Sequence, residues 1–154
     1  MDEIMIKAIY FDMDGTIANL YNQYNWRADL ENEKVRPYTN AKPMVNMVWL
    51  ARRLNQLQKM GYIIGIISWN CKGAREQYAQ EVEQAKMRWL AKHLPSVQFD
   101  EIHIVPYGTP KYEVAEVKEA ILFDDELQNL LEWGGEPVHA LAIDETLKHL
   151  LTNF

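Results

Sequence analysis

Short apolar segments alternate with longer segments of helical periodicity along this chain. The apolar runs are Ile4 to Phe11, 62–68, 101–105, 120–123 and 138–143. A short run that is apolar at successive positions is typical of a strand buried on both faces of a parallel sheet. Parallel neighbours need a crossover between them, and that crossover is usually a helix. The sequence therefore predicts an α/β fold, in which a five-stranded parallel sheet is doubly wound with helices on both faces.

Four segments between or after these runs have helical character. Residues 44–57 carry apolar side chains at spacings of three and four, and Pro43 suits the first turn of a helix. A longer helix is expected over 74–94, and short helices fit 126–133 and 144–151. The apolar side of the long helix is formed by Tyr78, Val82, Ala85 and Trp89. These helices supply the crossovers that the parallel sheet requires.

Polar residues gather where the predicted strands end, which is where ligands bind in open parallel sheets. Asp12 and Asp14 follow the first strand, and Asp124 and Asp125 follow the fourth. Four carboxylates in two pairs repel one another unless a proton or a cation relieves the repulsion. A hard divalent cation is the usual relief, and Mg²⁺ needs only two or three carboxylates because it keeps several waters. The sequence therefore predicts a Mg²⁺ site at this edge of the sheet.

The first pair of acids has a spacing that suits catalysis. In an extended segment, side chains two apart point to the same side, so Asp12 and Asp14 can face one reacting centre. One carboxylate can attack an electrophile while the other handles the proton. Gly15 lets the backbone turn sharply, and Thr16 offers a hydroxyl and a backbone N–H near an anion. We therefore expect this segment to carry the chemistry and to contact the substrate.

The composition narrows the function classes. The chain has 154 residues, of which 48% are apolar, and this predicts one globular domain over 1–154. No stretch approaches the ~18 apolar residues of a membrane span, and the acidic start lacks the basic region of a secretory signal. Cys71 is the single cysteine, so we expect a cytoplasmic protein without internal disulfides and without a membrane partner. The net charge of −6 argues against an extended nucleic-acid-binding face, and the oligomeric state is left open.

The segment FDMDGT resembles the DxDGT signature of the haloacid dehalogenase (HAD) superfamily, and the later residues are similar to its remaining motifs in order. The strand that ends in Ser68 is similar to the second motif, Lys111 to the third, and ILFDDE at 121–126 to the fourth. The resemblance extends from about Ile4 to about Asp144. It implies a Rossmann-like fold with strand order 3-2-1-4-5 and a Mg²⁺-dependent phosphohydrolase.

The resemblance also implies a role for each acid. Asp12 would be the nucleophile that takes the phosphoryl group as an aspartyl-phosphate. Asp14 would protonate the leaving oxygen and then activate the water that cleaves the intermediate. Asp12, the backbone carbonyl of Asp14, and Asp125 would hold Mg²⁺, while Asp124 would act through a metal-bound water or orient its neighbour. An acid at the position of Asp14 separates the family's phosphatases from its dehalogenases.

Phosphate contacts are expected from the loops after the second and third strands. By the same resemblance, Ser68 and Lys111 would grip the phosphoryl oxygens. Trp69 and Asn70 follow Ser68 and are expected to form a bulky wall of the substrate site. Lys118 is the rival to Lys111, but it lies just before the fourth strand, nearer its entrance than its catalytic end. We therefore favour Lys111 and keep Lys118 as the alternative.

The family often inserts a cap domain after its first motif or between its second and third. Here the first interval, Asn19 to Lys42, is too short for one, and the second is filled by one helix and one strand that the core itself requires. The chain is therefore expected to be capless, with segment 19–40 as the only flap over the site. This flap carries the aromatic residues Tyr21, Tyr24, Trp26 and Tyr38 and the basic residues Arg27, Lys34 and Arg36. Aromatic rings among basic side chains suit stacking on a base and neutralising a second phosphate. They suit equally the simpler task of pinning the flap to the sheet.

The predicted substrate is a phosphate monoester, either a nucleotide or a short nucleic-acid end. Small HAD nucleotidases and polynucleotide 3′-phosphatases are the members that this chain resembles, and the latter share a Pro-Met helix start like Pro43 and Met44. A long polynucleotide is disfavoured because phosphate contacts dominate that affinity and no basic run exists. The alternative is a catalytically inactive HAD fold that binds a phosphorylated ligand or partner. An intact Asp14 argues against it, since a pure binder needs no proton shuttle.

Overall fold

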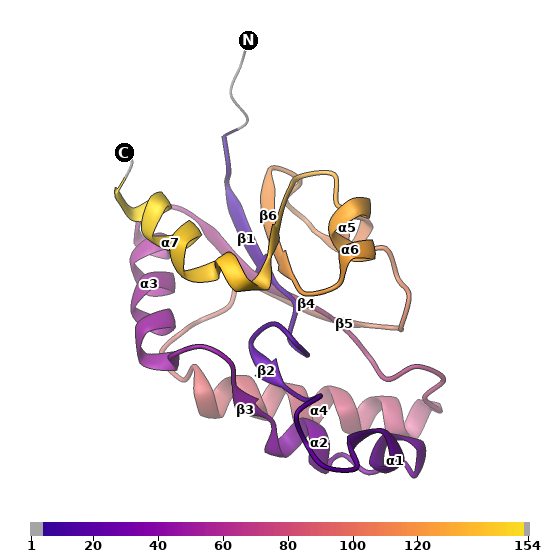
Figure 1. Ribbon diagram of the computed structural model, residues 1–154. Coiled ribbons are helices and arrows are strands. Elements are labelled where there is room, and N and C mark those ends of the chain that lie inside the picture. Colours follow the sequence, from indigo (N-terminus) through magenta and orange to yellow (C-terminus); the bar gives the residue numbers. More distant parts are fainter. Residues whose placement is uncertain (1–4, 153–154) are drawn as a thin grey trace.

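The computed structural model describes residues 5–152, and its centre is one parallel sheet (Figure 1). The five strands lie in the order β5-β4-β1-β6-β7, and every neighbouring pair is parallel. This confirms the predicted order, in which the third strand along the chain lies at one edge and the fifth at the other. The strands are β1 Ala8–Phe11, β4 Ile63–Trp69, β5 Glu101–Val105, β6 Ala120–Asp124 and β7 Glu136–His139.

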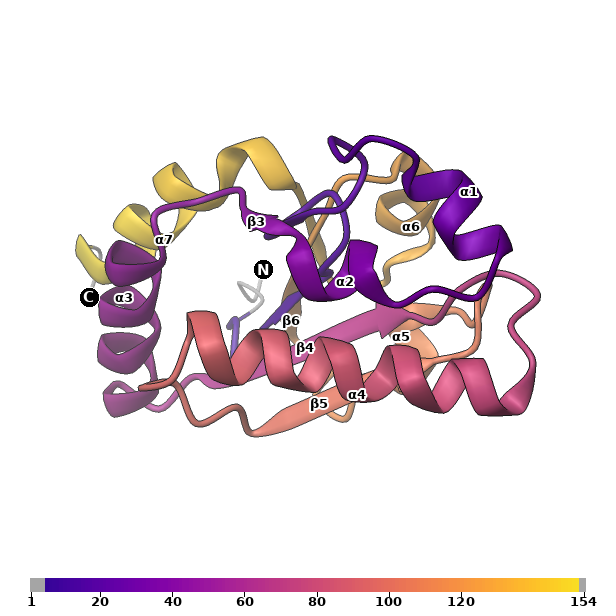
Figure 2. The ribbon, with the colours of Figure 1, turned by 90° about the horizontal axis from the view of Figure 1, so that it is seen from below.

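Helices cover both faces of the sheet, which confirms the doubly wound α/β architecture. On one face, Ile9 and Phe11 of β1 belong to the larger core with three helices (Figures 1 and 2). These are α3 Met47–Lys59, α4 Glu76–His93 and α7 Ile143–Thr152. On the other face, Ala8 and Tyr10 pack in a smaller core beside α5 Lys111–Val114 and α6 Leu127–Glu132. Strand β1 is buried from both sides because each face has its own cover.

Two predicted boundaries near the N-terminus need correction. Strand β1 begins at Ala8, later than the predicted start at Ile4, which lies outside the described residues. Helix α3 begins at Met47, so Pro43 does not occupy its first turn. Pro43 belongs instead to β3, Lys42–Pro43, and pairs with Ala18 of the short strand β2, Ala18–Asn19. The cap of α3 is Asn46, whose side chain accepts the Trp49 backbone N–H at 3.0 Å.

The last strand was also placed wrongly from the sequence. The apolar run at 138–143 predicts a strand there, but β7 ends at His139 and a 3₁₀ turn, η1, spans Ala140–Ala142. The His139 ring accepts the Leu141 N–H at 3.1 Å and caps this turn, and the Leu141 side chain is 90% exposed. The run was therefore misread because its apolar residues belong to a strand end, a turn and the start of α7.

The segment after β1 folds into more than the expected flap. Strands β2 (Ala18–Asn19) and β3 form a short antiparallel ribbon, and between them lie α1 (Trp26–Glu31) and α2 (Arg36–Asn40). Tyr38 of α2 packs in one apolar cluster with Tyr78 and Val82 of α4. Helix α2 packs against α4, and α1 lies next to α2 (Figure 1). Residues 5–152 contain no larger insertion, which agrees with the predicted absence of a large cap domain.

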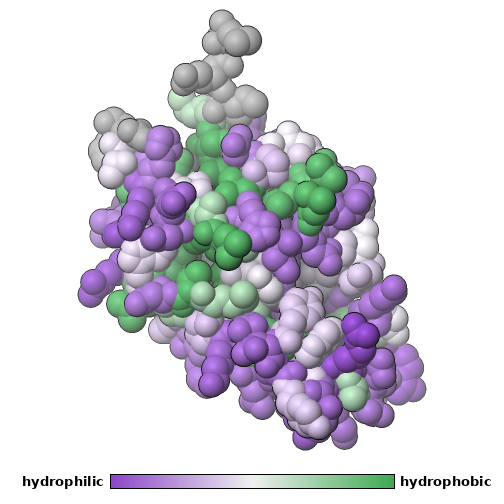
Figure 3. Space-filling model, in the orientation of Figure 1, coloured by the Kyte–Doolittle hydropathy of each residue, from purple (hydrophilic) through white to green (hydrophobic). Residues whose placement is uncertain are grey.

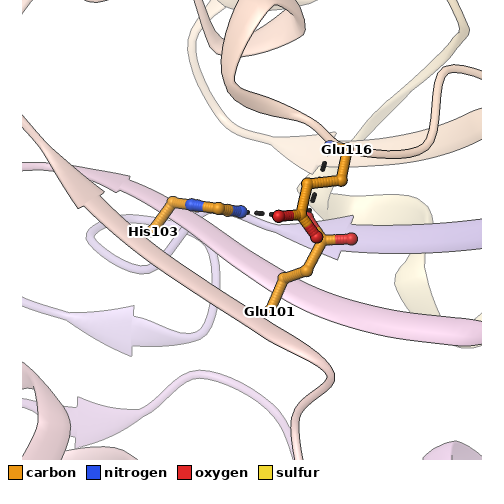
Figure 4. A group of neighbouring side chains, drawn as sticks. All are labelled: Glu101, His103 and Glu116. Carbon is orange, nitrogen blue, oxygen red and sulfur yellow. Dashed lines mark hydrogen bonds and ion pairs between the residues drawn. The ribbon is translucent and has the colours of Figure 1, made fainter.

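A buried hydrogen bond between Tyr10 and Glu101 crosses the sheet on the face that carries the smaller core. The Tyr10 hydroxyl donates to Glu101 Oε2 at 2.7 Å, reaching from β1 across β4 to β5. Gly65 of β4 makes this reach possible, because a Cβ there would lie 2.7 Å from the Tyr10 ring. Figure 4 shows the other Glu101 oxygen, which contacts the His103 ring at 2.9 Å and the Glu116 backbone N–H at 3.4 Å. Because each carboxylate oxygen has partners, this group fastens the edge strand to the sheet.

Within residues 5–152, no helix is long and apolar enough to cross a membrane. The surface seen in Figure 3 is mostly polar, with apolar areas over α6 and over the turn before α7. Three largely exposed leucines lie on these elements: Leu127, Leu131 and Leu141.

Candidate active site

A cavity of ≈ 550 Å³ lies at the carboxyl ends of the strands. Its floor carries the predicted acids and its walls come from the flap and from the loops after β4, β5 and β6. The predicted catalytic, metal-binding and phosphate-binding residues that line it are Asp12, Asp14, Trp69, Asn70, Lys111, Asp124 and Asp125. The crossover topology brings these groups together, since all strands of a parallel sheet end at one edge.

Asp12 is held at the end of β1 by contacts to both of its oxygens. Its backbone N–H donates to the Phe123 carbonyl at 2.9 Å, which continues the ladder with β6. Lys111 Nζ donates to Oδ1 at 2.8 Å, and the Thr16 hydroxyl donates to Oδ2 at 3.0 Å. The side chain is largely buried, so these contacts fix its orientation toward the cavity. Asp12 is therefore an oriented carboxylate beside a cation.

Lys111 bridges the two acidic pairs. Its ammonium donates to Asp12 Oδ1 at 2.8 Å and to Asp124 Oδ2 at 2.7 Å. Burial alone lowers the pKa of Lys111, but the two carboxylates outweigh it and raise that pKa above its usual value. Lys118 is remote from these acids and donates to the Tyr112 carbonyl instead. Of the two candidate lysines, the structure brings Lys111 to the acids.

The second acidic pair divides into a fixed and a more open member. Asp124 is fully buried, and its oxygens accept from Lys111, from Asn129 Nδ2 at 3.1 Å and from the Glu126 N–H at 3.0 Å. Asp125 is half-buried and faces Thr16, whose hydroxyl is 3.3 Å from its Oδ1. Asn129 was not predicted, and no pattern in the sequence distinguishes it from other helix residues.

The acidic cluster fits a divalent cation bound by oxygen. Carboxylate oxygens of Asp12, Asp124 and Asp125 all lie within 4.8 Å of one another. Burial and the Asp12 charge raise the pKa of Asp125 to about 7, and the same two causes raise the pKa of Asp124. Carboxyl groups whose ionisation is opposed in this way gain from a nearby cation. The donor set, hard oxygens from three acids, suits Mg²⁺.

Asp14 has a partner that sequence reasoning missed. Lys86 of α4 is 1% exposed, and its ammonium donates to Asp14 Oδ2 at 2.9 Å and to Ser68 Oγ at 2.7 Å. Burial raises the pKa of Asp14 above its usual value, and the Lys86 charge offsets part of that rise. A signal was available in the sequence, because Lys86 lies on the apolar side of its helix, four residues after Val82 and three before Trp89.

The remaining predicted contacts lie close to the acids but are engaged with the protein. Ser68 is buried at the end of β4 and contacts Lys86. The Trp69 indole N–H donates to the Thr109 carbonyl at 2.8 Å, so the ring is held as part of the wall. The Asn70 amide donates to the Ala79 carbonyl at 2.8 Å. The Thr16 hydroxyl is directed to the carboxylates described above. Phosphate binding by these four residues stays a prediction.

The flap contributes part of its aromatic set to the cavity. Tyr21 and Trp26 line the wall in an edge-to-face pair with ring centroids 4.9 Å apart, and Arg27 lies 5.3 Å from the Trp26 ring centroid. Tyr24 is 91% exposed and is not among the residues that line the cavity, unlike Trp26. Arg36 pairs with Asp29 on the surface at 2.8 Å and also lies outside the cavity.

Comparison with known proteins shows what this fold resembles. No protein-family model matches the sequence, and no curated protein is significantly similar to it. The D,D-heptose 1,7-bisphosphate phosphatase of Burkholderia thailandensis superposes with a TM-score of 0.50 at 14% identity, over 84% of this chain and 74% of that one. The B. bronchiseptica enzyme, solved with magnesium and phosphate, gives a TM-score of 0.52 at 15% identity, over 86% and 79%. These likenesses agree with the predicted α/β fold built on a five-stranded parallel sheet. At such identity the likeness establishes the fold, and the chemistry has to be argued from the site itself.

Proposed function

We propose that this protein is a Mg²⁺-dependent phosphatase that hydrolyses a phosphate monoester through an aspartyl-phosphate on Asp12. The observation that carries the proposal is the placement of Asp12 and Asp14 in one cavity, beside the acidic cluster and Lys111. A nucleophile, a proton-handling group, a cation and metal-ligating oxygens are the parts that phosphoryl transfer needs. The similar fold solved with magnesium and phosphate supports it.

The first chemical step uses both aspartates that follow β1. An Asp12 oxygen attacks the phosphorus, and the bond from phosphorus to the leaving oxygen breaks. Asp14 gives its proton to that oxygen, so the product leaves as a neutral alcohol. The Lys111 ammonium, 2.8 Å from Asp12, offsets negative charge at the nucleophile and at the incoming phosphoryl group. Burial raises the pKa of Asp14, which favours the protonated form that this step uses.

The second step returns the protein to its starting state. Asp14, now ionised, takes a proton from a water molecule whose oxygen attacks the phosphorus. The bond from phosphorus to Asp12 breaks, which releases inorganic phosphate and restores the Asp12 carboxylate and the Asp14 acid. When bound, Mg²⁺ neutralises charge on the phosphoryl oxygens. Asp12, the Asp14 carbonyl and Asp125 would hold it, while Asp124, fixed by Lys111 and Asn129, orients the cluster.

A nucleotide or a short nucleic-acid end is the substrate class that the cavity walls favour. Trp69 and Tyr107 form an aromatic pair with centroids 4.8 Å apart. The pair formed by Tyr21 and Trp26 lines the same cavity. Lys72 is 5.6 Å from the Tyr107 ring centroid, and Arg27 is beside Trp26. Rings accompanied by cations suit a planar base and a second anionic group.

Phosphate release from 4-nitrophenyl phosphate tests the reaction. With Mg²⁺ present we expect turnover that chelation abolishes and that Asp12→Asn reduces by several orders of magnitude, because a covalent nucleophile is lost. Asp144→Asn is the matched control, since this surface acid of α7, whose side chain is 59% exposed, lies outside the cavity. Activity that survives chelation or Asp12→Asn contradicts the mechanism.

A panel of 5′- and 3′-nucleotides, sugar phosphates and phosphopeptides tests the substrate class. We expect the highest kcat/KM with a nucleotide. Equal values across the panel contradict nucleotide recognition while leaving the phosphatase intact. Tight binding of phosphate esters with no turnover of any of them would favour the alternative function, a binding protein.

A further inference from the structure

The buried ammonium of Lys86 connects the two strand ends that carry Asp14 and Ser68. Besides those two contacts, it donates to the Trp69 carbonyl at 2.8 Å, and the Tyr38 ring centroid lies 5.2 Å away. A lysine ammonium has three donors, and each of them meets one acceptor here. All three acceptors belong to the residues that follow β1 or end β4. The side chain thus reaches from the middle of α4 to the catalytic edge of the sheet.

Structural needs alone do not account for a charge at this place. Its neighbours on the same side of α4, Val82 and Trp89, are apolar and buried. Burying an ammonium costs several kcal/mol unless its partners are well placed, and apolar side chains of similar volume often replace buried ion pairs without loss. An apolar residue would therefore serve the packing of α4, whereas Lys86 serves its three acceptors.

We propose that Lys86 is a positioning residue for the phosphatase reaction, holding Asp14 and Ser68 in their working orientations. The inference rests on the proposed function and names a residue that acts through others, since Lys86 is not among the residues that line the cavity. By engaging Oδ2, Lys86 leaves Oδ1 as the Asp14 oxygen that exchanges the proton. By donating to Ser68 Oγ, it leaves the serine's own hydrogen free to donate to another acceptor.

This arrangement predicts a dependence on the leaving group. A 4-nitrophenolate leaves well without a proton, so forming the aspartyl-phosphate from 4-nitrophenyl phosphate needs little from Asp14. An alkoxide leaves poorly, so glycerol phosphate needs Asp14 in that step. Hydrolysis of the aspartyl-phosphate needs Asp14 as a base for either substrate. A residue that positions Asp14 therefore affects one step for the aryl ester and two for the alkyl ester.

The experiment compares Lys86→Met with Lys92→Met, which makes the same change at an exposed position of α4. With 4-nitrophenyl phosphate, Lys86→Met is expected to release about one equivalent of nitrophenolate in a burst and then turn over slowly. With glycerol phosphate we expect no burst and a fall in kcat of about 100-fold or more, the usual contribution of a positioned acid–base group. For glycerol phosphate KM is expected to change far less than kcat, whereas for the aryl ester KM is expected to fall together with kcat, because the aspartyl-phosphate accumulates when its hydrolysis is slow. Lys92→Met is expected to behave as wild type.

A merely structural lysine gives a different result. In that case Lys86→Met lowers kcat by the same factor on both substrates and shows no burst. The fall in kcat then matches a smaller fraction of correctly folded, active protein, and this result overturns the inference. Lys86→Arg decides the matter if Lys86→Met does not fold, because it keeps the charge but presents a planar fork to three acceptors. Lys86→Arg is expected to show the same difference between the two substrates with a smaller fall in kcat. An equal fall in kcat on both substrates without a burst overturns the inference. If wild type shows no turnover that depends on Asp12, the phosphatase proposal falls and takes this one with it.

Discussion

Gly15 lies directly against the carboxylate of Asp125. A Cβ at Gly15 would be 2.2 Å from Asp125 Oδ2, well inside van der Waals contact, and the φ of Gly15 is 83°. The turn at Gly15, which follows Asp12 and Asp14, is thus in direct contact with the carboxylate of Asp125. The glycine of the FDMDGT segment is required by this close approach as well as by the backbone conformation.

Gly15→Ala is predicted to abolish Mg²⁺-dependent activity, because the new methyl group displaces Asp125. Gly61→Ala is the control: its φ is 102°, yet nothing lies within 4 Å of a Cβ there. Both variants are expected to lose about 1–2 kcal/mol of unfolding free energy from the positive φ. Only Gly15→Ala is expected to lose activity and Mg²⁺ binding, measured by calorimetric titration. A fully active Gly15→Ala contradicts the geometry.

The pKa of Asp125, raised to about 7 by burial and by Asp12, predicts a pH-dependent response to Mg²⁺. A carboxyl group whose folded pKa is raised gives stability that is complete below its unfolded pKa of about 4 and lost as pH rises through about 7. The metal-free protein is therefore expected to lose stability from this group as pH rises over that window. Mg²⁺ competes with the proton, so it is expected to raise Tm more at about pH 8 than at about pH 5. Equal Tm shifts at both pH values would contradict this.

Replacing Trp26 by Leu is predicted to reduce kcat/KM for nucleotides by roughly tenfold, the effect of losing one stacking surface. The 4-nitrophenyl ester should be affected much less. Tyr24→Leu is a matched control, because Tyr24 belongs to the same flap but is 91% exposed and outside the cavity lining. Steady-state kinetics with both substrates checks the prediction. Equal losses on both substrates would mean that Trp26 shapes the site without contacting a base.

Tyr10→Phe is predicted to destabilise the fold while leaving catalysis intact. Removing the hydroxyl leaves the buried Glu101 carboxylate short of its 2.7 Å partner and the Val117 N–H short of an acceptor at 3.1 Å. Unpaired buried polar groups cost about 1–3 kcal/mol. Tyr112→Phe is expected to cost little, since the Tyr112 hydroxyl makes one long contact of 3.4 Å in an exposed setting. Urea unfolding measures both, and equal stability of the two variants would show that the Tyr10 bridge contributes nothing.

The sequence predicted the parallel sheet and the acidic residues at its carboxyl edge, but not the bounds of the first and last strands. Strand β5 was predicted with its observed bounds, and β4 and β6 to within one residue at each end. Apolar runs report such strands well because both faces are buried. The apolar run at 138–143 was misread because a run of apolar residues does not distinguish a strand end from a turn and a helix start.

The site shows the same division. The sequence placed Asp12, Asp14, Asp124 and Asp125 together, since all parallel strands end at one edge, and preferred Lys111 to Lys118 by the same reasoning. It did not find Lys86 as the partner of Asp14, nor the exposure of Tyr24. Helical periodicity indicates which side of α4 faces inward. It does not indicate which residues of other segments each inward side chain contacts. Only the packing of α4 against the ends of β1 and β4 decided that a buried lysine meets a carboxylate, because contacts between distant segments depend on how the elements are arranged in space.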